Sequence, residues 1–430
     1  MTYPSDYRPA PPVEKTVFCK KKYTAAAILL ISLLLFLCCA CSTGGDSGIV
    51  PDRDRGDTAA SSSSEKRTPA LSENKLPEDR EISPSLVFKE DLPLDYAECF
   101  RISLYSDGFY LISICDGSRF LLQPGDTPEP EDLDPDITVL SGPVDRIYLA
   151  ASACMDMFVK TGALNSISLS GTDTDKWFIS EARDAMKTGS ILYAGKYNAP
   201  DYELILSSGC RLAVENTMIL HTPEVREQLI RTGIPVLIDH SSYETSPLGR
   251  TEWVKLYGIL TGHEKEALEA FEAQKQACAE AVSDEKNNRT MAFFSINSSG
   301  GVTVRKSTDY VPSMIRLAGG CYLPDDLSDG SIRSTSTLQM EDFCQRARDA
   351  DCLIYNSTIE GAITSTDELL DRAPAMKNFR AVKKGRVWCT AQDLYQDSME
   401  TGTIISDLHR ILTDPDTADN ELQYFYRLKA

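Results

Sequence analysis

A long uninterrupted helix near the middle of the 430-residue sequence most constrains what this chain can fold into. Residues 263–283 read HEKEALEAFEAQKQACAEAVS, and Glu264 and Glu266 lie in the first turn, where the helix dipole favours acids. Apolar residues recur near helical spacing without proline or glycine, and such a helix is roughly 30 Å long. Because the sequences on both sides of it follow the same pattern, we expect two lobes joined by this helix, with a cleft between them.

Short apolar strands alternate with amphipathic helices on both sides of the helix. Before it, residues 146–151, 166–171, 212–217 and 235–240 read as buried strands; after it, residues 290–296, 352–358 and 386–391 do. This alternation predicts parallel sheets with right-handed crossovers. The expected fold class is therefore α/β, with two Rossmann-like lobes joined by one long helix. Two Asp-Gly turns within residues 99–123 add a small N-terminal β-meander of three strands.

The domain organisation that we expect has six segments. They are a lipoprotein signal peptide (1–41), a disordered tether (42–95), an accessory β-meander with an acidic loop (96–142), an N-terminal α/β lobe (143–262), a connecting helix (263–284) and a C-terminal α/β lobe (285–430). The tether is assigned from its serine run, scattered prolines and few large apolar residues.

The N-terminus carries an export signal. Three lysines at residues 20–22 precede an apolar run at 24–40, and Cys41 follows. This order resembles the lipobox of bacterial lipoproteins: Ala40 and Cys41 match its last two positions, whereas Cys38 and Cys39 depart from the usual residues. The resemblance implies cleavage before Cys41, lipidation of Cys41 and a body held outside the cytoplasmic membrane. An uncleaved membrane anchor is the alternative, because the run is at the lower limit for a span.

Charge and cysteine content exclude several classes of partner and site. The net charge of −20 argues against nucleic acid, which rewards clustered Lys and Arg. Nine cysteines follow Cys41, an odd number without CxxC spacing, so neither a disulfide framework nor a zinc site is indicated. The four histidines lack HxH or HExxH spacing, and there is no GxSxG motif. We therefore expect no catalytic residues, no metal site and no cofactor.

Polar and aromatic side chains gather where the predicted strands end. Ligands of open parallel sheets bind beyond the carboxyl ends of the strands, and aromatic walls with fixed cations suit a large, flat, partly anionic ligand. Arg250 follows the fourth strand of the first lobe, and Arg305 and Lys306 follow the first strand of the second, so we expect these cations to face each other across the cleft. The candidate ligand-binding residues are Trp177, Tyr243, Arg250, Arg305, Lys306, Tyr310, Tyr355 and Tyr395.

The order of several modest motifs resembles a known family. The segment from Thr188 to Val214, then EQLIRTGIPVLI, then LYGILTGHEKEALEAF, and later MIRLAGG and GRVW look like the solute-binding proteins of ABC importers for iron siderophores, haem and cobalamin. The likeness covers about residues 145–413 and departs at residues 209–211, where Lys-Pro-Asp is usual. It implies that Glu203 and Glu341, one in each lobe, dock onto arginines of the permease.

The function that we expect is therefore an extracytoplasmic, lipid-anchored binding protein that captures a metal chelate and delivers it to an ABC permease and its ATPase. We expect a monomer that is not an enzyme. Two alternatives stay open: an enzyme that uses the same cleft on cell-envelope substrates, and a ligand sensor that works without transport.

Overall fold

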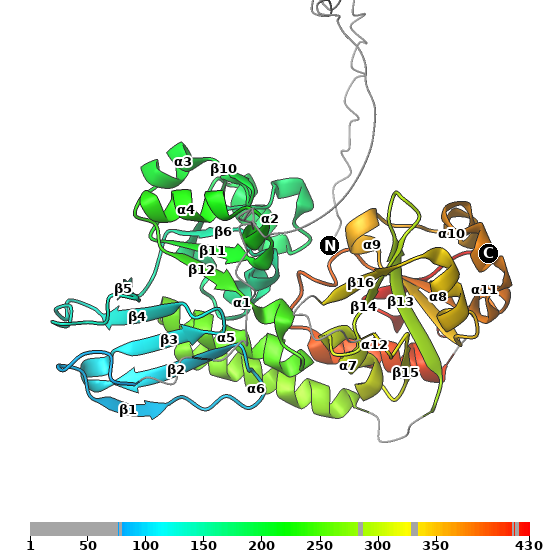
Figure 1. Cartoon of the computed structure of the whole chain (residues 1–430), viewed down its shortest axis with the longest axis horizontal. Coiled ribbons are helices and arrows are strands. Elements are labelled where there is room, and N and C mark those ends of the chain that lie inside the picture. The colour runs from blue at the N-terminus through cyan, green and yellow to red at the C-terminus, as the bar shows by residue number, and fades with distance from the viewer. Residues whose placement is uncertain (1–75, 77–79, 283–286, 328–333, 415–416, 418–420) are drawn as a thin grey trace, which may run out of the picture. The chain divides into compact units, whose positions relative to one another are not determined.

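The computed structural model describes residue 76 and residues 80–282, 287–327, 334–414, 417 and 421–430. Over this range the chain forms an N-terminal accessory sheet followed by two α/β lobes (Figure 1). The expected signal peptide and the greater part of the expected tether lie outside the described residues. None of the described helices combines the length and the hydropathy of a transmembrane segment.

The accessory sheet has five strands in the order β1-β2-β3-β4-β5. The predicted three-stranded meander is present as β2, β3 and β4, which pair antiparallel, and β5 adds parallel to β4. One face of this sheet shares a hydrophobic core with the first lobe. The strands are β1 (Phe88–Asp91), β2 (Phe100–Tyr105), β3 (Tyr110–Ile114), β4 (Arg119–Pro124) and β5 (Ile137–Gly142).

The start of the accessory sheet corrects the expected tether boundary at residue 95. Strand β1 pairs with β2, and Ile82 and Leu86 are buried against the outer face of the sheet. These apolar residues are sparse and lie among prolines and charged residues. The local composition therefore predicted a disordered segment, although the segment is ordered. The described residues 80–95 therefore belong to the folded body.

The first lobe is built on a five-stranded parallel sheet in the order β12-β11-β6-β7-β8. Alternate residues of its strands enter two different cores: Val214 faces the accessory sheet and helix α5, and Ala213 faces the opposite core. Its elements are β6 (Ile147–Leu149), α1 (Met155–Lys160), β7 (Ile167–Ser170), α2 (Ser180–Lys187), β8 (Leu192–Tyr193), β9 (Gly195–Lys196), β10 (Ala199–Pro200), α3 (Tyr202–Ser207), β11 (Leu212–Asn216), α4 (Pro223–Arg231), β12 (Val236–Asp239) and α5 (Pro247–Thr261).

The second lobe holds a seven-stranded mixed sheet in which β15, β13, β17 and β18 are parallel. Strands β14, β16 and β19 pair antiparallel, and the sequence patterns above did not indicate them. Its elements are β13 (Thr290–Ile296), β14 (Val302–Arg305), α7 (Tyr310–Leu317), β15 (Cys321–Leu323), β16 (Thr335–Leu338), α8 (Met340–Ala347), β17 (Cys352–Tyr355), α9 (Ser357–Glu360), α10 (Thr366–Arg372), α11 (Arg380–Lys383), β18 (Val387–Thr390), α12 (Thr401–Thr413) and β19 (Phe425–Arg427).

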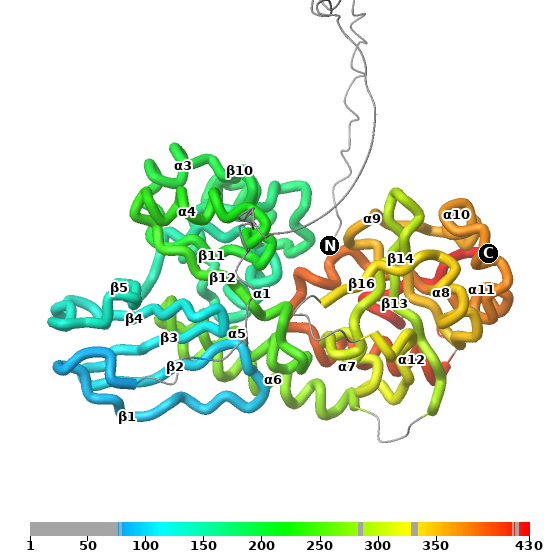
Figure 2. Tube along the Cα trace, in the orientation of Figure 1, coloured from blue at the N-terminus to red at the C-terminus, as the bar shows by residue number. Residues whose placement is uncertain are grey.

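Between the lobes in the chain lies helix α6 (Glu264–Ala281), the long helix that the sequence predicts (Figure 2). It packs closely on one helix from each lobe. A Cβ placed on Gly258 of α5 would meet the Ala267 Cβ at 2.3 Å, and one on Gly402 of α12 would meet the Ala277 Cβ at 2.6 Å. Small residues at both contacts thus let the backbone of α6 approach α5 and α12 more closely than larger side chains would allow.

Candidate functional site between the lobes

Residues 391–400 lead from β18 to α12 and touch the first lobe along much of their length; we call them the interlobe segment. The Gln396 side chain donates to the Lys176 carbonyl and accepts from the Phe178 N–H, both at 2.8 Å. Lys176 and Phe178 follow strand β7. A side chain of the second lobe therefore satisfies backbone groups at a strand end of the first.

Two further contacts join helix α1 to the interlobe segment. The Met399 N–H donates to the Asp156 carboxylate at 2.8 Å, and Lys160 Nζ lies 2.9 Å from a Glu400 oxygen. Asp156 is buried, whereas the Lys160–Glu400 pair is partly exposed. The buried hydrogen bond therefore fixes this contact more firmly than the partly solvated ion pair.

Two arginines from different lobes converge on two tyrosines at the same junction. Arg250, in the first turn of α5, donates to the Tyr395 carbonyl at 3.0 Å, and its guanidinium lies 4.7 Å from the Tyr310 ring centroid. Arg305, at the end of β14, donates to the Tyr395 hydroxyl at 2.5 Å. Its guanidinium lies 5.0 Å from the Tyr395 ring and 5.8 Å from the Tyr310 ring. We call these four residues the arginine–tyrosine cluster.

The cluster carries more positive than negative charge. Asp309 lies 3.4 Å from Arg305 and also caps helix α7 by accepting from the Val311 N–H at 2.9 Å. Burial raises the pKa of Asp309, and the neighbouring Arg305 opposes this only in part. Arg250 Nε is buried and makes no hydrogen bond among the described residues. One carboxylate beside two guanidinium groups leaves the cluster with an excess of positive charge.

The other candidate ligand residues have different surroundings. Trp177 and Tyr355 belong to the hydrophobic cores: Trp177 Nε1 donates to Ser170 Oγ at 3.2 Å, and the Tyr355 hydroxyl accepts from Arg372. Tyr243 is partly buried, with its ring 5.5 Å from that of His240. The side chain of Lys306, beside Arg305, is buried as well. The structure thus brings together Arg250, Arg305, Tyr310 and Tyr395, and it places Trp177 and Tyr355 in the packed interior.

The two acids expected to dock the permease occupy equivalent local positions. Glu203 is exposed in the first turn of α3, and Glu341 is exposed in the first turn of α8. Each helix precedes a parallel strand of its own lobe, β11 or β17. Both side chains are therefore free to reach a partner protein.

Several residues at this junction were not among the candidates from sequence. Asn356 Nδ2 donates to the Tyr395 hydroxyl at 3.2 Å, so it belongs beside the arginine–tyrosine cluster. Phe178, Met218 and Ile359 follow strands β7, β11 and β17 and remain 41%, 47% and 59% exposed. Large apolar side chains left in water at strand ends are candidates for ligand contact. The signal available in the sequence was that each of these residues follows a predicted strand. The sequence alone does not show which side chains at such positions are exposed.

A pocket of about 520 Å³ opens where the interlobe segment meets the first lobe, and acidic groups line it. Burial raises the pKa of Asp156 to about 6, although the Met399 N–H and Lys160 oppose the shift. Burial also raises the pKa of Asp397 to about 6, against a hydrogen bond from Tyr424. No group of three His, Cys, Asp or Glu side chains that could hold a metal ion occurs in the described part of the chain.

Comparison with known proteins identifies the architecture. A family model described as "Periplasmic binding protein" matches residues 168–394, just over half of the chain. Two uncharacterized lipoproteins of Methanocaldococcus jannaschii are similar in sequence. One is 27% identical over 314 residues, covering 69% of this chain and 72% of that protein, and the other is 23% identical over 352 residues, covering 78% and 86%.

Solved structures share the fold. A periplasmic haem-binding protein from Pseudomonas aeruginosa superposes with a TM-score of 0.51 and 16% identity, covering 66% of this chain and 99% of that one. A possible iron-binding, periplasmic solute-binding protein from Staphylococcus epidermidis superposes with a TM-score of 0.50 and 15% identity, covering 63% and 98%. The two lobes thus have the arrangement of periplasmic binding proteins, and the accessory sheet precedes the matched range.

The buried carboxylate of Asp156 should make the stability of the protein depend on pH. Because the pKa of Asp156 is raised in the folded state, its ionisation disfavours folding as pH rises through about 6. Asp156→Asn should therefore raise the melting temperature relative to wild type at pH 8, by an amount equivalent to about 1–3 kcal/mol. The difference should shrink toward pH 4, where wild-type Asp156 is protonated. Thermal melts of both proteins at the two pH values provide the measurement.

Asp184→Asn is the matched control, because Asp184 is exposed on α2. It should change the melting temperature little at either pH. An Asp156→Asn variant that is less stable than wild type at pH 8 would show that hydrogen bonding to Met399 outweighs the cost of burying the charge.

Proposed function

The chain belongs to the periplasmic binding protein family, and we propose that it is the extracytoplasmic substrate-binding lipoprotein of an ABC importer. In this proposal it captures a metal chelate, a ferric siderophore, haem or cobalamin, and delivers it to the permease. The observation that carries the proposal is the convergence of Arg250 and Arg305, from different lobes, on Tyr310 and Tyr395. The names of the structural neighbours, haem-binding and possible iron-binding proteins, support the ligand class.

The arginine–tyrosine cluster suits a flat ligand that carries carboxylate or other anionic groups. In the structure, Arg305 donates to the neutral hydroxyl of Tyr395. An anionic oxygen accepts a stronger hydrogen bond from a guanidinium than a neutral hydroxyl does, so a ligand can replace Tyr395 as the acceptor. The buried Nε of Arg250 offers a further donor. We propose that Tyr243, Lys306, Phe178, Met218 and Ile359 surround this anchor, and that Trp177 and Tyr355 support it from the cores.

Ligand binding by the cluster can be tested with Arg305→Ala. Loss of a charged hydrogen bond should weaken the binding of an anionic ferric chelate by about 1–3 kcal/mol. Isothermal titration calorimetry against ferric siderophores, haem and cobalamin measures the effect, and Arg250→Ala should weaken binding in the same direction. Arg231→Ala, at an exposed position on α4, should leave affinity unchanged. Tight binding of uncharged ligands alone, unaffected by either cluster variant, would rule out the anionic chelate and point to a neutral solute.

Docking to the permease is proposed for Glu203 and Glu341. Each is an exposed acid on a different lobe, so the pair can meet two basic sites of one membrane partner. Reversing either charge, as in Glu203→Arg or Glu341→Arg, should preserve ligand affinity and reduce ligand-stimulated ATPase activity of the reconstituted transporter. Glu266→Arg on the exposed face of α6 is the control and should leave stimulation intact. Normal stimulation by both lobe variants would remove the docking role.

Membrane attachment is proposed to occur through a lipid on Cys41, which lies outside the described residues. The lysines, apolar run and Ala40-Cys41 pair carry this proposal, and the similar proteins of M. jannaschii named lipoproteins support it. Metabolic labelling with a fatty-acid probe should tag the wild-type protein and leave Cys41→Ala unlabelled. Equal labelling of both proteins would show that the lipid is attached elsewhere.

A further inference from the structure

Two cysteines lie opposite one another at the open end of the hairpin that β2 and β3 form in the accessory sheet. The register of β2 and β3 pairs Phe100 with Ile114, so the next residues outward, Cys99 and Cys115, lie opposite one another. The Cys115 N–H donates to the Cys99 carbonyl at 2.8 Å. Directly opposed residues of antiparallel strands have Cα atoms about 4.5–5.5 Å apart, which lies within the range of disulfides.

Cys99 is held at this place by the first lobe. The Glu244 carboxylate accepts from the Cys99 N–H at 2.9 Å and from the Glu98 N–H at 2.8 Å. The same carboxylate accepts from Trp253 Nε1 at 2.9 Å. The backbone of Cys99 is thus fixed from one side by Glu244 and from the other by strand β3, which keeps its side chain beside Cys115.

The second thiol lies in an unusual electrostatic environment. His240 Nε2 is 3.5 Å from an Asp116 oxygen, and both side chains are buried. Burial lowers the pKa of His240, but Asp116 and Cys115 outweigh it and raise the pKa to about 9. The neighbouring Cys99 thiol and the charge of His240 outweigh burial at Cys115 and lower its pKa to about 6. At neutral pH this arrangement favours an imidazolium beside a Cys115 thiolate.

Other buried thiols of the chain lack this environment. Burial raises the pKa of Cys278 and Cys352 to about 12 each, and both lie in hydrophobic surroundings of the second lobe. Thiolates are the reactive form in thiol–disulfide exchange. The thiolate form is therefore favoured at Cys115 over Cys278 and Cys352, with Cys99 placed to complete the reaction.

We propose that Cys99 and Cys115 are a redox-active pair that closes to a cross-strand disulfide when the exported protein meets a low-molecular-weight disulfide. The Cys115 thiolate attacks one sulfur of that disulfide, forming a mixed disulfide and releasing one small thiolate. The Cys99 thiol then loses its proton and attacks the Cys115 sulfur, forming the Cys99–Cys115 bond and releasing the second small thiol. The pair is oxidised by two electrons, and the small disulfide is reduced to two thiols.

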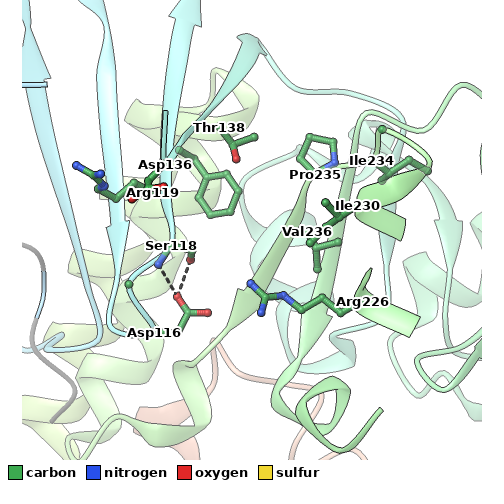
Figure 3. Close-up of a pocket in the computed structure, with 13 residues that line it drawn as sticks. Asp116, Ser118, Arg119, Asp136, Thr138, Arg226, Ile230, Ile234, Pro235 and Val236 are labelled. Atoms are coloured by element: carbon green, nitrogen blue, oxygen red, sulfur yellow. Dashed lines mark hydrogen bonds between the residues drawn. The ribbon is translucent and has the colours of Figure 1, made fainter. Parts of the chain in front are cut away.

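A pocket lined by Asp116, the residue that follows Cys115, lies near the pair (Figure 3). It has a volume of about 470 Å³ and lies between the accessory sheet and the first lobe. Asp116 lines it and accepts from the Ser118 N–H at 2.9 Å and from Ser118 Oγ at 2.6 Å, so the partner of His240 forms part of the pocket wall. Arg119 and Arg226 line the pocket together with Asp116 and Asp136, and Arg119 is paired with Asp134 at 2.6 Å, so Arg226 is the cation of the wall that can meet a carboxylate of a small disulfide.

The test uses the full-length protein, fully reduced, freed of reductant and then exposed to oxidised glutathione at pH 7.5. After an acid quench, unfolding and alkylation, peptide mapping by mass spectrometry identifies the disulfides. A linked peptide pair that contains Cys99 and Cys115 should dominate. In Cys99→Ser, a mixed disulfide with glutathione should accumulate at Cys115, because the second step is blocked. In Cys115→Ser, Cys99 should stay reduced.

Two further comparisons separate this proposal from unselective oxidation. His240→Gln should slow formation of the linked pair about tenfold, because less Cys115 is then thiolate. Cys321→Ser, which alters an exposed thiol, should leave the rate unchanged. Cys99 and Cys115 that remain reduced in the folded protein, or that react no faster than Cys321 and form no mutual bond, would overturn the proposal. Circular dichroism of each variant shows whether the fold is retained.

Discussion

Helix α5 is the element on which the remaining architecture depends, because its buried polar side chains bind both the second lobe and the accessory sheet. Thirteen of its fifteen residues are buried. Arg250 reaches Tyr395, and Thr251 lies 2.9 Å from the Thr401 hydroxyl, both in the second lobe. Glu252 accepts backbone N–H groups from three successive residues, 95–97, between strands β1 and β2 of the accessory sheet. Since an unpaired buried polar group costs about 1–3 kcal/mol, these three side chains specify three neighbours.

Close backbone approach accompanies these polar contacts. A Cβ placed on Gly249 would lie 2.8 Å from the Tyr96 carbonyl oxygen, so the segment that connects β1 and β2 passes directly over the first turn of α5. One turn later in α5, the Glu252 carboxylate accepts hydrogen bonds from N–H groups of the same segment. The accessory sheet is therefore an integrated part of the first lobe, sharing its core and its hydrogen bonds, although it lies outside the range matched by the family model.

Much of this fold follows from the periodicity of the sequence, and the site follows from it only in part. Buried parallel strands such as β11 and β17 are short apolar runs, and α6 is an uninterrupted helical pattern, so both were predictable. Strand β14 carries Arg305 after a Ser-Gly stretch that reads as a loop. Arg250 follows a proline that reads as a loop but begins a helix. Strand order predicted that the two arginines would lie near each other. The burial of Trp177 and Tyr355 depends on which face of the sheet or loop each side chain occupies, and composition does not reveal that face.

The interlobe segment joins the lobes largely through its main chain: the Tyr395 carbonyl, the Ser398 carbonyl and the Met399 N–H all bind side chains of the first lobe. A backbone contact needs a residue at the right position and is largely indifferent to its identity. Substitutions at Ser398 and Met399 can therefore preserve these main-chain contacts, while an inserted or deleted residue would shift each of the partners out of reach.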